Sequence, residues 1–123
     1  MNEKPLIDVA QERVLSLAGE TQFAPNGIVS RTLLRTPGSR VVLFGFAEGQ
    51  GLTEHTSTQS AIVQILSGEC EFSLGGQPRT VRAGDLIYMP PHLPHAVRAT
   101  KQFSMLLTLT RSGRSAAPKT VNN

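Results

Sequence analysis

The sequence predicts one all-β domain, and three observations indicate that fold class. Short apolar runs recur from Gly27 onward, and several alternate apolar and polar residues, as half-buried strands do. Glycine, proline and small polar residues separate the runs, as tight turns require. No stretch after Gly27 has the 3.6-residue period of an amphipathic helix, so βαβ units are not expected. Many short strands at regular spacing are typical of a β-sandwich or a β-barrel.

Nine strands are expected, and the clearest of them is the run ECEFSL. There Cys70, Phe72 and Leu74 fall on one side and polar residues on the other, so one face should be buried. Turn residues separate neighbouring runs, most plainly in PGS at 37–39 and GG at 75–76. The expected strands cover residues 28–35, 40–47, 52–56, 61–66, 69–74, 79–82, 86–89, 95–100 and 102–110.

The two ends of the chain depart from this pattern. Residues 1–26 are expected to form an N-terminal arm, for which two local structures are open. Asp8 could cap a short helix over residues 9–17, or RVLSLAG could form an edge strand. Residues 27–111 should form the barrel, whereas SGRSAAPKTVNN at 112–123 is small and polar and is expected to be disordered.

Charge and composition argue against several classes of function. The formal net charge is +3, and Arg111, Arg114 and Lys119 near the C-terminus account for that excess. No stripe of basic and aromatic residues is present, so no nucleic-acid binding is expected. No apolar run approaches the ~18 residues of a membrane helix, and no signal peptide is evident, so we expect a cytoplasmic protein without membrane contact. Cys70 is the only cysteine, which excludes an internal disulfide and a site built on several thiolates.

The three histidines, His55, His92 and His95, carry the functional prediction. Two of them lie in AGDLIYMPPHLPHAV, where three prolines fix their own φ and restrict the residues before them. We therefore expect an extended, kinked loop that delivers His95 to the start of the next strand, at the mouth of the barrel. If the strands pair antiparallel through the hairpins between them, His55 and His95 face each other there.

Two motifs resemble those of the cupin family, whose members fold as a double-stranded β-helix, or jelly-roll barrel. The first, G-x5-H-x-H-x3–4-E-x6-G, corresponds to GQGLTEHTSTQSAIVQILSG, with Gly49, His55 and Gly68 in register. The second, G-x5-P-x-G-x2-H-x3-N, corresponds to GDLIYMPPHLPHAVRA, where His95 is in register and His92 replaces the internal glycine. The resemblance runs from about residue 27 to residue 110 and implies an all-β, cupin-type double-stranded β-helix.

The resemblance implies a metal site that this sequence retains only in part. Metal-binding cupins hold Fe, Mn, Zn, Ni or Cu with three histidines and one glutamate. His55 and His95 match two of these ligands, but Ser57 stands at the second histidine position. The glutamate position is taken by Ala61, or by Ile62 if the gap is one residue longer. Two neutral imidazoles supply neither the ligand number nor the negative charge of a firm site. We expect no firmly bound cofactor, and a divalent metal (Zn, Fe, Mn or Ni) held weakly by His55, His95 and His92 remains open.

The expected functional site is a pocket at the barrel mouth. Its predicted residues are His55, Ser57, Gln59, Ala61, Val63 and His95. An apolar pocket with imidazoles at its mouth suits a small, partly apolar molecule that bears an acid or a hydroxyl. The first hypothesis is therefore a small-molecule-binding protein of unassigned metabolic or regulatory role, and the resemblance implies a homodimer. The alternatives are a metal-dependent oxygenase or isomerase with an atypical histidine site, and a partner-binding module without chemistry; the sequence leaves catalysis undecided.

Overall fold

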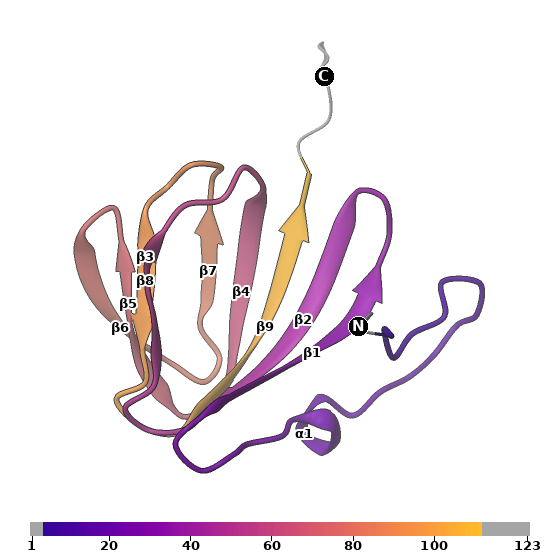
Figure 1. The fold of residues 1–123 in the computed structure, drawn as a ribbon, viewed down its shortest axis with the longest axis horizontal. Coiled ribbons are helices and arrows are strands. Elements are labelled where there is room, and N and C mark those ends of the chain that lie inside the picture. Colours follow the sequence, from indigo (N-terminus) through magenta and orange to yellow (C-terminus); the bar gives the residue numbers. More distant parts are fainter. Residues whose placement is uncertain (1–3, 112–123) are drawn as a thin grey trace, which may run out of the picture.

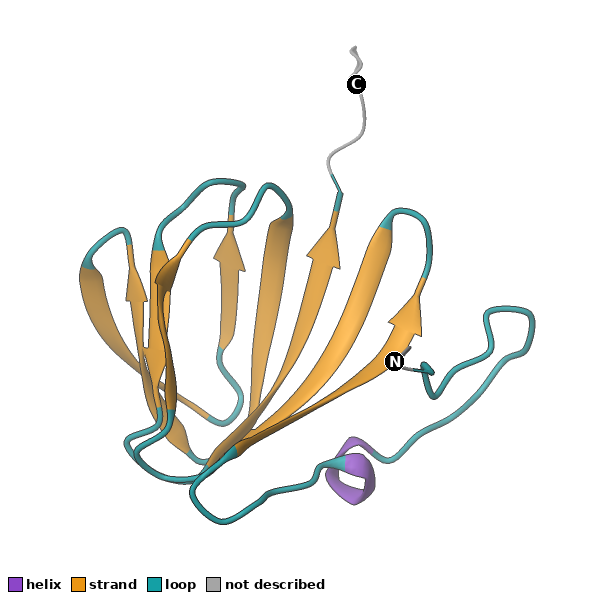
Figure 2. Cartoon of the chain, in the orientation of Figure 1, coloured by secondary structure: helices purple, strands orange, loops and turns teal. Residues whose placement is uncertain are grey.

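Nine strands form two facing sheets in the computed structural model, which describes residues 4–111. The five-stranded sheet has the order β1-β2-β9-β4-β7 and the four-stranded sheet the order β3-β8-β5-β6 (Figure 1). The paired strands all run antiparallel. The strands are β1 (Ile28–Arg35), β2 (Ser39–Phe46), β3 (Gly51–His55), β4 (Ser60–Ser67), β5 (Glu69–Leu74), β6 (Gln77–Arg82), β7 (Leu86–Met89), β8 (His95–Arg98) and β9 (Phe103–Thr110). Loops and short turns join them (Figure 2), and the predicted all-β fold class is confirmed.

Every strand expected from the sequence is present, with ends that differ by at most two residues. The largest differences are at β6, which begins at Gln77 rather than residue 79, and at β8, which ends at Arg98 rather than residue 100. The predicted tail at 112–123 lies outside the described residues. No helix in residues 4–111 is long and apolar enough to cross a membrane.

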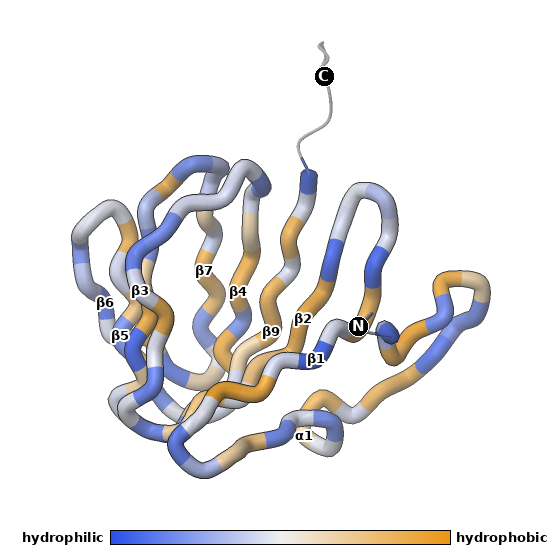
Figure 3. Tube along the Cα trace, in the orientation of Figure 1, coloured by the Kyte–Doolittle hydropathy of each residue, from blue (hydrophilic) through white to orange (hydrophobic). Residues whose placement is uncertain are grey.

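The core lies between the two sheets because alternate residues of each strand point inward. Val63 of β4 and Phe72 of β5 are buried in this way, with polar or exposed neighbours on either side. Phe46 and Phe103 face each other across β2 and β9 and stack with ring centroids 4.5 Å apart. Figure 3 shows hydrophobic segments recurring along β2 and β9. This packing fixes the two sheets relative to each other and so fixes the strand ends that form the mouth.

The N-terminal arm takes neither of the two expected structures. Its helix, α1 (Leu17–Glu20), is a single turn capped by the Ser16 hydroxyl, which accepts a hydrogen bond from the Gly19 N–H at 3.0 Å. Asp8 instead accepts from the Ala10 N–H at 3.0 Å and closes only a turn. Residues 9–16 form no helix, and Val14 among them is 97% exposed. Neither open alternative, a helix over residues 9–17 or an edge strand at RVLSLAG, is present in the structure.

The arm runs along β1 and then crosses the outer face of the five-stranded sheet. The N–H groups of Leu6 and Ile7 donate to the β1 carbonyls of Thr32 and Leu33 at 3.2 and 2.8 Å. After α1, the arm passes so close to β2 that a Cβ on Gly45 would lie 2.1 Å from the Gln22 carbonyl oxygen. The arm therefore covers part of this outer face and leaves the barrel mouth open.

Candidate functional site

Five strands contribute to a cavity of about 300 Å³ at one end of the barrel. The cavity lies at the end of β3, β7 and β9 and at the start of β4 and β8. Its lining residues are His55, Thr56, Ser57, Gln59, Ala61, Met89, Pro90, Leu93, His95, Leu107 and Leu109. The volume is at the lower end of the ~300–1,000 Å³ range of small-molecule pockets, so the cavity fits a small ligand.

A β-bulge in β3 turns His55 toward the cavity. Leu52 pairs with Val97 of β8, and His55 pairs with His95, so three residue steps on β3 match two on β8. Leu52 packs against the core, and strict alternation from it would point His55 to the outside. The extra residue reverses that direction, which is a common role of bulges beside functional sites. The sequence motif places His55 correctly, but the bulge is visible only in the strand register.

His55 and His95 face each other across β3 and β8. Their ring centroids are 4.3 Å apart and their planes meet at 60°, an edge-to-face arrangement. His55 is exposed at the rim, and His95 is partly buried beside it. The sequence prediction that the two imidazoles converge at the mouth describes this geometry.

Both rings are held in the same tautomer by the backbone. The Nδ1 of His55 lies 2.7 Å from the Thr53 carbonyl oxygen, and the Nδ1 of His95 lies 2.8 Å from the Leu93 carbonyl oxygen. A carbonyl oxygen only accepts, so each Nδ1 must carry the proton and donate it. Each neutral ring therefore keeps the lone pair on Nε2, and no residue from 4 to 111 forms a hydrogen bond with either Nε2. Two nitrogen lone pairs remain available to a ligand.

Ser57 holds the loops at the mouth in place. The Ser57 hydroxyl accepts from the Gln59 N–H at 3.0 Å, and the Ser57 carbonyl accepts from the His92 N–H at 2.7 Å. The second bond ties the β7–β8 loop to the β3–β4 loop. Ser57 thus lines the cavity and joins the two loops that carry the histidines.

Comparisons with known proteins agree with this architecture. The sequence model of the cupin domain matches residues 42–110, more than half of the chain. The chain belongs to the cupin family. No curated protein matches this cupin.

Solved structures with this fold include proteins without a stated activity. A conserved protein of unknown function from Streptococcus pyogenes is 31% identical, with a TM-score of 0.79 over 92% of this chain and 97% of that one. A cupin superfamily protein from Desulfitobacterium hafniense is 27% identical, with a TM-score of 0.78 over 91% of this chain and all of that one. Salicylate 1,2-dioxygenase from Pseudoaminobacter salicylatoxidans shares the fold at 16% identity and a TM-score of 0.65, over 73% of this chain and 28% of that one.

The residues of this cupin do not fit a firmly held divalent metal. A catalytic metal site ordinarily has three protein ligands, often including a carboxylate or thiolate. Among residues 4–111, His55 and His95 are the only imidazoles in the cavity lining, and that lining contains no carboxylate or thiol. Within residues 4–111, no group of three or more histidine, cysteine, aspartate or glutamate side chains is arranged to hold a metal ion. Ser57 and Ala61 line the cavity, so the residues that stand at the second histidine and glutamate positions of the motif lie beside His55 and His95.

Two predicted site residues lie outside the cavity. Val63 lies two residues after Ala61 on β4 and points inward like it, but it lies beyond the cavity. It is fully buried in the core. His92 is exposed and does not line the cavity, and its backbone has φ +70°. His92 stands where the second cupin motif has glycine. Glycine readily adopts a positive φ, which most other residues avoid. The predicted three-histidine group does not form in this arrangement.

Sequence reasoning missed several apolar wall residues. Met89, Pro90 and Leu93 come from the proline-rich loop and its flanks, whereas Leu107 and Leu109 come from β9. Alternation along β9 predicts that Leu107 and Leu109 point inward, but it does not predict that they line a cavity. Only the meeting of β9 with β4 shows that this face reaches the mouth.

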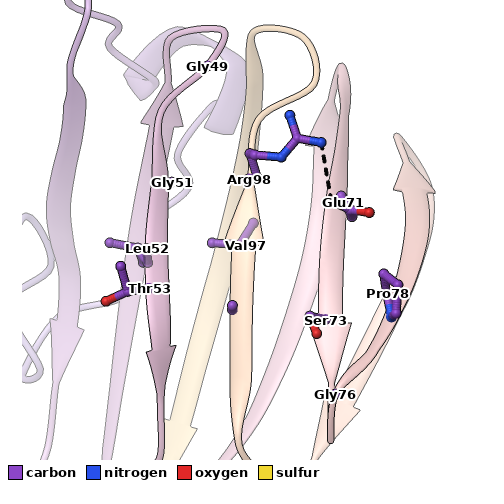
Figure 4. Close-up of a pocket in the computed structure, with 11 residues that line it drawn as sticks. Gly49, Gly51, Leu52, Thr53, Glu71, Ser73, Gly76, Pro78, Val97 and Arg98 are labelled. Atoms are coloured by element: carbon purple, nitrogen blue, oxygen red, sulfur yellow. Dashed lines mark hydrogen bonds and ion pairs between the residues drawn. The ribbon is translucent and has the colours of Figure 1, made fainter.

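A larger hollow of about 630 Å³ lies on the outer face of the four-stranded sheet (Figure 4). Glycine, alanine, serine and threonine form much of its wall. Its two charged residues, Glu71 and Arg98, form an ion pair with each other at 3.2 Å. That pairing leaves the hollow without a free charged group to fix a ligand, so the histidine cavity is the better candidate site.

Proposed function

We propose that this cupin binds a small, partly apolar molecule bearing a carboxylic acid or a hydroxyl, in the cavity around His55 and His95. One observation carries the proposal: two facing imidazoles, each with Nδ1 held by a carbonyl, retain Nε2 for a ligand in a cavity that is otherwise uncharged. Apolar walls from β7, β9 and the proline-rich loop would bury the rest of the molecule.

The chemistry of imidazole favours these two ligand groups. A neutral Nε2 accepts a hydrogen bond from a hydroxyl, and a protonated one donates to a carboxylate. An acid can bind a protonated ring as a charge-assisted pair. Because no carboxylate of the described residues lines the cavity, an anionic ligand meets no like charge from them there. The role would be metabolic or regulatory.

The alternative is a metal-dependent cupin enzyme, an oxygenase or isomerase. One observation favours it: a carbonyl on Nδ1 is also the usual partner of a histidine that binds metal through Nε2. Such an enzyme would need at least one further ligand, which the described residues do not supply. Metal analysis therefore separates the two candidates.

The ligand test uses two acids and their uncharged counterparts. Benzoate and hexanoate are compared with benzamide and hexanamide by thermal shift and calorimetry at pH 6 and pH 8. A ligand at about 100 times its Kd stabilises the native state by about 2.7 kcal/mol, so binding raises Tm. We expect the acids to raise Tm more than the amides, and His55→Ala and His95→Ala to abolish the difference.

His92→Gly is the matched control, because it removes an imidazole outside the cavity and glycine tolerates φ +70°. It should bind the acids as the wild type does. Failure of all four probes and of a broader set of hydroxylated compounds would refute the proposal and favour a partner-binding module. Stoichiometric metal in protein purified without a histidine tag, lost in both cavity variants, would establish the metal-dependent alternative instead.

A further inference from the structure

Arg111 continues the inward row of β9 past the end of the strand. Leu107 and Leu109 of that row line the cavity, and Arg111 stands two residues after Leu109. Its backbone N–H donates to the Gly38 carbonyl at 2.8 Å, so the pairing of β9 with the β2 side extends one step beyond Thr110. Because side chains alternate along a paired strand, the Arg111 side chain starts on the cavity side, about 7 Å beyond Leu109. Arg111 therefore lies at the rim of the mouth.

The Arg111 guanidinium is available to a ligand. The residue is exposed, and within residues 4–111 no carboxylate forms an ion pair with it. On the β4 side the next residue in the register is Gln59, which lines the cavity, and on the β2 side Gly38 has no side chain. A guanidinium binds a carboxylate through two parallel N–H donors, so an arginine at this rim suits an acid.

The surroundings of the mouth carry more positive than negative charge. Arg35 at the end of β1 and Arg40 near the start of β2 lie opposite each other at the same end of the barrel as Arg111. Among the residues that the structure describes, Glu54 of β3 is the single acidic residue at the strand ends and loops of this mouth. The local field therefore attracts an anionic ligand.

The imidazoles and Arg111 stand on opposite sides of the mouth. His55 and His95 come from β3 and β8 of the four-stranded sheet, whereas Arg111 follows β9, the middle strand of the five-stranded sheet (Figure 1). Packed sheets lie about 10 Å apart, and both kinds of side chain extend into that space. A small molecule with a polar group at each end can therefore reach the imidazoles and the guanidinium at once. Apolar lining residues such as Leu93 and Leu109 would contact its middle.

We propose that Arg111 determines the specificity of the cavity by binding a carboxylate at the far end of the ligand. This rests on the proposed function, in which an acid or a hydroxyl meets Nε2 of His55 or His95. The second contact names the class of ligand, a short aliphatic molecule with an acid or a hydroxyl at one end and a carboxylate at the other. Dicarboxylates and hydroxy acids belong to that class, whereas a plain acid uses only one of the two contacts.

The test compares adipate with hexanoate, which differ by one terminal carboxylate. Calorimetry at constant ionic strength gives the Kd of each, and adipamate, the half-amide of adipate, has the same length without the second charge. Adipate should bind wild type about five- to tenfold more tightly than hexanoate or adipamate, because it gains one charge-assisted contact. Arg111→Gln should remove that advantage and leave the Kd of hexanoate unchanged. Arg111→Lys, which keeps the charge without the fork of donors, should restore part of it.

Arg35→Gln is the matched control, because it removes an equal charge from the same end of the barrel, at the edge of the sheet. Both arginines are exposed, so neither change disturbs the core. Arg35→Gln should retain the preference for adipate, and an equal loss in both variants would overturn the contact with Arg111.

Two other results overturn the role of Arg111 while hexanoate still binds and the proposed function stands. One is a wild type that binds adipate no more tightly than hexanoate, and the other is an adipate advantage that survives Arg111→Gln. If neither acid binds, the role of Arg111 fails together with the acid-binding part of the proposed function.

Discussion

Replacement of Gly68 by alanine should destabilise the barrel far more than the same change at Gly76. Both glycines have positive φ, +76° at Gly68 and +83° at Gly76, so both substitutions strain the backbone. They differ in surroundings. A Cβ on Gly68 would lie 2.0 Å from the Gln102 carbonyl oxygen and 2.8 Å from the Phe103 Cα, whereas Gly76 has no atom within 4 Å of such a Cβ.

The magnitude follows from these two terms. A non-glycine residue in the left-handed region costs about 1–2 kcal/mol, offset in part by about 0.4–1 kcal/mol from the stiffer unfolded chain. Gly76→Ala should therefore lower the free energy of unfolding by about 1 kcal/mol. Gly68→Ala must also displace the start of β9, where Phe103 is fully buried and stacks on Phe46 at 4.5 Å. Overpacking of this kind costs about 1–3 kcal/mol more, so the total is about 2–4 kcal/mol.

Urea unfolding of both variants, with the m-value compared, measures the two free energies. These free-energy losses should lower Tm by roughly 8–16 °C for Gly68→Ala and by roughly 4 °C for Gly76→Ala. Equal losses would refute the reasoning, since the clash with Gln102 would then contribute nothing. A positive result explains physically why the first cupin motif ends in glycine, at the corner between β4 and β5.

Three further predictions concern buried or lining positions. Burial, with a smaller contribution from the Glu69 charge, raises the pKa of the Cys70 thiol to about 12, so iodoacetamide at pH 8 should leave it unmodified until the chain unfolds. The unfolded thiol has the ordinary pKa of 9.0, so it loses its proton at a lower pH than the native thiol does. The free energy of unfolding should therefore fall as pH rises from about 9 toward 12, and Cys70→Val should lack that decline. Ala61→Glu would place a carboxylate in the cavity with His55 and His95, so Zn²⁺ should raise the Tm of this variant but not that of wild type or Ala61→Gln. Gly45→Ala should displace the arm rather than unfold the barrel, because its Cβ would meet the Gln22 carbonyl, and limited proteolysis should then cut the arm first.

The sequence by itself determined the nine strands and the family. Alternation in runs such as ECEFSL is a local property of the pleated strand, and turn residues such as the Gly75–Gly76 pair need only a local backbone conformation. The spacing of the two motifs also located His55 and His95 at one mouth. The strands and turns can be read from sequence because each depends on residues close together in the chain, whereas the position of His55 and His95 at one mouth followed from the resemblance to the two cupin motifs.

Tertiary structure alone decided the rest. The bulge that turns His55 inward exists only against β8, and the Nδ1 bonds that free each Nε2 depend on how Thr53 and Leu93 are placed. The arm forms one helical turn, Leu17–Glu20, instead of a helix over 9–17, and Val14 of that segment is left exposed. Whether an inward residue such as Val63 or Leu109 lines a cavity or fills the core depends on which strands pack against it. Pairing between strands that are far apart in the sequence decides these features, and alternation along one strand contains no information about that pairing.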